Sequence, residues 1–115
     1  MFGWLSGTIL ATYQRGNRHL IVLRCGSVGY EVNVIQRDWN DITQHEERAY
    51  WIHQVCQNDD TILYGFQSLS TRELFHTLIS VNGVGPQVGL ALLQECSVED
   101  PVSYTHLRAH ETAMY

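Results

Sequence analysis

The first 66 residues alternate apolar and polar side chains in short stretches rich in β-branched and aromatic residues, a pattern typical of β-strands. Gly, Asn and Asp residues between the stretches indicate turns. Five short strands in about 65 residues favour a five-stranded OB-type β-barrel over an immunoglobulin sandwich, which needs about seven. The expected strands are Gly3–Tyr13, His19–Arg24, Gly29–Ile35, Arg48–Gln57 and Thr61–Phe66.

After Phe66 the apolar spacing changes to that of helices. Ser68, Ser70 and Thr71 offer N-caps for a first helix, and apolar residues through Ile79 form one face of it. The segment 82–86 ends that helix, and its proline suits the first position of a second helix that runs to about Gln94. The predicted fold class is mixed, β then α: an OB-type barrel over 1–66, followed by a partial helix-hairpin-helix domain over 67–100.

The last segment, 101–115, does not continue either pattern. Residues Val102–Thr112 resemble one reading frame of a transposon-type sequencing adapter. We therefore expect the natural sequence to stop near Asp100 and exclude this tail from the fold. A genuine polar tail is the alternative, and the nucleotides that encode it would distinguish the two.

Composition limits the class of protein. The chain has 115 residues, enough for one small domain or one domain and part of a second. No apolar run is long enough to span a bilayer, and the first residues do not form a signal peptide. Three cysteines without a CxxC pair are expected to be buried thiols in a reducing compartment, the cytoplasm.

The strongest candidate chemistry lies between the two predicted helices. Glycines at 83 and 85 allow a tight turn, and amides near the start of the second helix can bind a phosphate. Such binding reads only the DNA backbone and is independent of base sequence. An ordinary turn between helices explains the glycines equally well. The candidate phosphate-binding residues are Gly83, Val84, Gly85 and Gln87.

A second candidate is the acidic turn formed by Asn58, Asp59 and Asp60 between the last two strands. A solvated turn is the ordinary explanation. The functional alternative is an acidic pin that repels phosphates and keeps strands apart. His53 and Cys56 face opposite sides of a strand, so we expect no metal site there. We find no catalytic constellation and expect no cofactor.

Six motifs, in order along residues 1 to about 100, together resemble the RuvA family, the Holliday-junction-binding subunits of bacterial branch-migration complexes. This resemblance is more specific than any single motif. The motifs are Met1–Thr8, Val28–Val32, Ile62–Phe66, Glu73–Phe75, Ser80–Pro86 and Leu90–Leu93.

The resemblance implies an OB barrel, tandem helix-hairpin-helix motifs and a third domain that binds the hexameric ATPase motor RuvB. It also implies a homotetramer that holds four-way junction DNA open for recombination and repair, with an acidic pin at its centre. The subunit would be an accessory DNA-binding protein, because ATP hydrolysis belongs to the motor. Here the pin corresponds to Asn58 and Asp59, with Asp60 beside them.

Several residues depart from the family pattern. The first pin position, usually acidic, is Asn58, and the position after Pro86, often basic, is Gln87. The second hairpin motif and the motor-binding domain would lie beyond Asp100, so we expect only part of the DNA-binding apparatus. Val88, Leu92 and Leu93 are then expected to lack packing partners.

The net charge of −5 argues against a nucleic-acid partner and conflicts with the motifs. All seven basic residues are arginines; Arg15, Arg18 and Arg72 are candidate electrostatic helpers. The pin and the missing second hairpin offer an explanation for the acidic balance. The alternative function is a free-standing OB module that binds single-stranded DNA or a protein through aromatic residues. Candidate stacking residues are Trp4, Tyr30, Trp39, Trp51 and Tyr64, although core packing is the commoner role.

Overall fold

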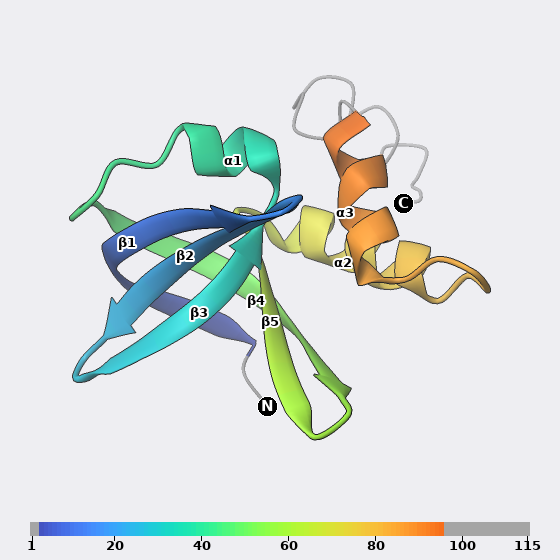
Figure 1. Ribbon diagram of the computed structural model, residues 1–115, viewed down its shortest axis with the longest axis horizontal. Helices are drawn as coiled ribbons and strands as arrows, with labels where there is room; N and C mark the ends of the chain where they lie inside the picture. The colour runs from blue at the N-terminus through green and yellow to red at the C-terminus, as the bar shows by residue number, and fades with distance from the viewer. Residues whose placement is uncertain (1–2, 96–115) are drawn as a thin grey trace.

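The computed structural model describes residues 3–95 (Figure 1). Five strands form a closed barrel in the order β1-β2-β3-β5-β4, and two helices follow it along the chain. This is the predicted fold class, an OB-type barrel followed by a helix-hairpin-helix. The predicted tail, 101–115, lies outside the described residues. The strands are β1 (Trp4–Arg15), β2 (Arg18–Cys25), β3 (Val28–Val34), β4 (Glu47–Gln57) and β5 (Asp60–Phe66).

Two pairings close the barrel. The first residues of β1 pair antiparallel with β4 before the strand goes on to pair with β2, and β3 lies parallel to β5. Side chains on alternate positions point inward, as the alternation of the sequence predicts. The barrel core consists of Leu5, Ile9, Ile21, Leu23, Val32, Val34, Tyr50, Ile52 and Leu63.

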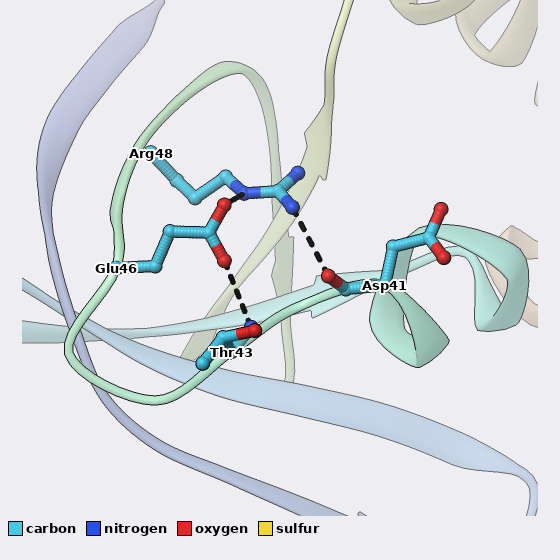
Figure 2. Close-up of polar contacts among 4 residues, drawn as sticks. All are labelled: Asp41, Thr43, Glu46 and Arg48. Carbon is cyan, nitrogen blue, oxygen red and sulfur yellow. Dashed lines mark hydrogen bonds and ion pairs between the residues drawn. The ribbon is translucent and has the colours of Figure 1, made fainter.

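The connection from β3 to β4 contains a short helix, α1 (Gln36–Asn40), that the sequence analysis did not predict. The loop after it is fixed by polar contacts (Figure 2). The Glu46 carboxylate accepts hydrogen bonds from the Thr43 amide and from Arg48 Nε, both at 2.8 Å, and Arg48 also donates to the Asp41 carbonyl. The bond from Thr43, followed by that from Arg48, lowers the pKa of Glu46. Glu46 thus stabilises this loop through its carboxylate.

Two helices follow the barrel, α2 (Leu69–Ile79) and α3 (Pro86–Glu95). Ser68 caps α2, as predicted, because its side chain accepts a hydrogen bond from the Thr71 amide. Pro86 occupies the first position of α3, also as predicted.

The helices and the barrel share a second hydrophobic cluster, so the pair packs directly on one end of the barrel. Leu93 is fully buried in this cluster, so the expectation that it lacks partners was wrong. Val88 and Leu92 remain exposed. The cluster consists of Ile35, Tyr64 and Phe66 from the barrel region, with Phe75, Leu90 and Leu93 from the helices.

Candidate nucleic-acid interface

A tight turn joins α2 to α3. The Val84 amide donates to the Val81 carbonyl at 3.1 Å, and Gly83 has φ of +87°. A positive φ at the third residue of a hydrogen-bonded turn is the geometry of a type II turn, which favours glycine there. Gly83 therefore sets the direction in which the chain enters α3.

The N-terminus of α3 presents amides toward solvent. Its first intrahelical bond runs from the Gly89 amide to the Gly85 carbonyl at 2.9 Å, so Gly85 is the N-cap residue. The amides of Gly85, Gln87 and Val88 precede that bond, and Pro86 has none to donate. This end of a helix favours anions through its amides and its dipole. The Val84 amide is engaged within the turn.

A hollow of about 260 Å³ opens beside this helix end. It is bounded by α3, by Arg18 at the start of β2 and by Gln57 near the tip of the β4–β5 hairpin. Of the predicted residues, Gly85, Gln87 and Arg18 are thus brought together. Val84 and Gly83 lie just before them in the turn.

Contacts at the base of the hollow join the barrel to α3. Gln87 and Tyr64, which is nearly fully buried in the shared cluster, line the hollow together. Burial raises the pKa of Tyr64, while the Gln87 side chain and the charge of Arg18 oppose that shift. Gln87 carries no charge, so its backbone amide is the group that favours a phosphate.

The predicted acidic pin forms the turn of the β4–β5 hairpin, which extends beyond the barrel on the side away from α1 (Figure 1). Asn58 and Asp59 have φ of 47° and 70°. Two consecutive positive φ values match a type I′ turn, which Asn and Asp tolerate well. Asp60 begins β5 opposite Gln57, so Asn58 and Asp59 form the tip and Asp60 lies beside it. All three are exposed.

The other two arginines lie apart from the hollow's lining. Arg15 ends β1 and lies over the Tyr13 ring at 5.1 Å. Arg72, on α2, donates to Glu73 at 3.2 Å, which partly offsets its charge. Its positive charge also contributes, after burial and His76, to lowering the pKa of His53.

Three of the five candidate stacking residues contribute to the fold. Tyr30 and Trp39 pack against the barrel core, and Tyr64 is buried. Trp39 also donates to the Leu20 carbonyl at 3.0 Å and packs edge-on against His19. Trp4 is 51% exposed and lies 6.4 Å from Trp51, measured between ring centroids. Within residues 3–95 no group of three potential ligands could hold a metal ion, and no helix is long and apolar enough to cross a membrane.

Sequence reasoning missed Asn33. Alternation along β3 placed this residue on the polar, outward face, yet only 2% of its surface is exposed. It accepts a hydrogen bond from Arg18 Nε and donates to the Leu63 carbonyl, both at 3.2 Å. No local signal in the sequence indicates that contact, because its partners lie 15 and 30 residues away.

The described residues form a small OB-type barrel that carries a helix-hairpin-helix, with a helix N-terminus beside Arg18, an arrangement whose chemistry suits the phosphates of a nucleic acid. The chain belongs to the RuvA family: the family model described as the RuvA N terminal domain matches residues 1–65.

Curated relatives extend the similarity past the barrel. The chain is 46% identical over 103 residues to the Holliday junction branch migration complex subunit RuvA of Parasynechococcus marenigrum (strain WH8102), which covers 90% of this chain and 50% of that protein. It is 48% identical over 102 residues to the same subunit of Synechococcus sp. (strain CC9605), which covers 89% of this chain and 48% of the relative. The chain thus spans about half the length of the curated relatives it matches.

Proposed function

We propose that this chain binds four-way junction DNA and acts as an accessory subunit of a branch-migration complex in recombination and repair. The observation that carries the proposal is the hollow where the N-terminus of α3, Arg18 and Gln57 near the tip of the acidic hairpin meet. The curated relatives, named as Holliday junction branch migration complex subunits, support the same function.

In this proposal a backbone phosphate binds at the N-terminus of α3, because Gly85, Gln87 and Val88 direct amides to one side of the helix end. The carboxylates of Asp59 and Asp60 then repel phosphates and favour strand separation at the crossover. Amides bind the backbone of any sequence, so recognition depends on the junction's shape.

The remaining partners follow from the same proposal. ATP hydrolysis would belong to a RuvB-type hexameric motor, whose binding region lies outside the residues described here. A homotetramer would present four hairpins to the four arms. A protein that acts on bacterial chromosomal DNA would work in the cytoplasm.

A gel-shift series with a four-way junction, a duplex and a single strand of matched sequence tests the proposal. We expect the junction to bind best and every affinity to fall as salt rises. Equal affinity for the three DNAs at low salt would contradict junction binding.

A second candidate function rests on the exposed Trp4 beside Trp51. Aromatic residues on an OB surface stack on unpaired bases or contact a protein. This alternative predicts that single strands bind best and that Trp4→Ala weakens binding more than any change in the hairpin.

A further inference from the structure

We propose that Asn33 is a positioning residue that orients Arg18 toward the phosphate bound by α3, so that barrel and hairpin share one phosphate site. The inference rests on the proposed function. To the phosphate site of that proposal it assigns a charged partner from the barrel, Arg18, and the buried side-chain amide of Asn33 that holds Arg18 in place.

Arg18 lies beside the N-terminus of α3. It lines the 260 Å³ hollow together with Gly85, Pro86 and Gln87. It also lines a second hollow of about 300 Å³, with Tyr30, Asn33 and Thr61, along β3 and β5. Ile62 lines both as well, so Arg18 lies where two depressions meet. A DNA strand whose phosphate is bound by the α3 amides would pass the Arg18 guanidinium whether it continued along the first hollow or the second.

A hydrogen bond to Asn33 holds the guanidinium of Arg18 at one atom. Arg18 donates through Nε to Asn33 Oδ1, which leaves the donors of both Nη groups for another acceptor. A guanidinium held at Nε presents its Nη groups in a fixed fork, the arrangement that suits phosphate oxygens. Asn33 is itself fixed, because its Nδ2 donates to the Leu63 carbonyl.

Gln87 supplies no charge to this site. A residue at its position of α3 could itself reach a phosphate, but the glutamine side chain is neutral. Arg18 lines the same hollow as Gly85 and Gln87, so it lies beside the helix end. The cation of this phosphate site therefore comes from β2.

The test measures junction affinity across a salt series for Arg18→Gln, Asn33→Ala and the double variant. We expect Arg18→Gln to lower affinity about tenfold, the effect of losing one charge-assisted hydrogen bond. It should also reduce the slope of log affinity against log salt by about one phosphate contact. Asn33→Ala should lower affinity in the wild-type background and have no further effect once Arg18 is Gln.

Arg24→Gln is the matched control. It removes the same charge from the exposed far end of β2, so we expect the wild-type affinity and slope. The proposal would be overturned if Asn33→Ala lowered junction affinity equally in the wild-type and Arg18→Gln backgrounds. It would also be overturned if Arg18→Gln left the slope of log affinity against log salt unchanged.

Asn33 is buried, so thermal melting must show that Asn33→Ala is folded. If it is not, Arg18→Lys provides the second test, because lysine keeps the charge but lacks the Nε that Asn33 holds. We expect Arg18→Lys to keep the salt slope and lose affinity severalfold, and wild-type affinity would refute positioning.

Gly85→Ser distinguishes failure of the shared phosphate site from failure of the proposed function, because it disturbs the α3 amides and leaves Arg18 unchanged. If Gly85→Ser weakens binding and Arg18→Gln does not, the shared site is wrong and the proposed function stands. If neither weakens binding, the proposed function also fails.

Discussion

Two glycines of the hairpin, Gly83 and Gly85, should respond to substitution in opposite ways. A Cβ added at either position meets no atom within 4 Å, so steric crowding is excluded at both. Gly83 has φ of +87°, whereas Gly85 does not lie in the positive region. Only Gly83 therefore depends on glycine for its backbone conformation.

Gly83→Ala should destabilise the protein by about 1–2 kcal/mol, the energy of a left-handed conformation with a Cβ. In a domain of this size, that corresponds to a fall in Tm of about 4–16 °C. Gly85→Ser should instead stabilise α3 by a few tenths of a kcal/mol, because serine is a better N-cap and its Oγ accepts from the Val88 amide.

The same capping should weaken DNA binding, because the serine Oγ competes with the phosphate for an amide. We expect Gly85→Ser to lower junction affinity about tenfold while Tm stays equal or rises. Thermal melting by circular dichroism and fluorescence anisotropy with a labelled junction measure the two effects. Gly85→Ser with wild-type affinity, or Gly83→Ala with wild-type Tm, would refute the reasoning.

Three further changes test the pin, a histidine pair and the barrel core. Asp59→Asn removes a carboxylate from the hairpin tip, so in gel shifts the affinity for duplex DNA should rise severalfold and the preference for the junction over the duplex should decrease. The control Asp41→Asn should change neither quantity. An unaltered preference in Asp59→Asn argues against the pin. The pKa of His53 is lowered by burial, His76 and Arg72, so the unfolded chain binds more protons near pH 6.5 and stability should fall as pH drops through that range. His53→Gln should flatten the dependence of Tm on pH between 8 and 5. The remaining dependence would come from His19, whose pKa is also lowered. An unchanged dependence of Tm on pH in His53→Gln would contradict the assignment to His53. The Tyr50 hydroxyl is buried without a hydrogen-bond partner among the described residues, and burial raises its pKa to about 12. Tyr50→Phe should therefore keep or raise the free energy of unfolding measured in urea. A loss above about 1 kcal/mol would show that the hydroxyl makes a hydrogen bond in the folded protein.

The sequence predicts the barrel well because a closed barrel buries one face of every strand. Val32 and Val34 point into the core at the alternate positions that the pattern indicates. The turns were also predictable, since Asn58 and Asp59 are residues that tolerate positive φ. The short helix α1 escaped prediction because it has only five residues and none is buried.

The candidate site was only partly predictable. The hairpin glycines and Pro86 are local signals, and they locate the N-terminus of α3. That Arg18 lies beside this terminus depends on how the helix pair packs on the barrel. Asn33 lies on the face of β3 that alternation predicts to be exposed, and it is buried among partners that are distant in the sequence, Arg18 and Leu63. Contacts between residues so far apart in the sequence produce no periodic pattern of apolar and polar residues that could predict them.

The most direct test of the central claim is a titration of the ¹⁵N-labelled chain with a four-way junction, followed by NMR. A phosphate bound at the start of α3 shifts the amides that donate to it. We predict the largest shifts at Gly85, Gln87 and Val88, with none of that size at Trp4. Largest shifts at Trp4 and Trp51, with the three hairpin amides unmoved, would contradict the claim and favour a barrel that binds through its aromatic residues.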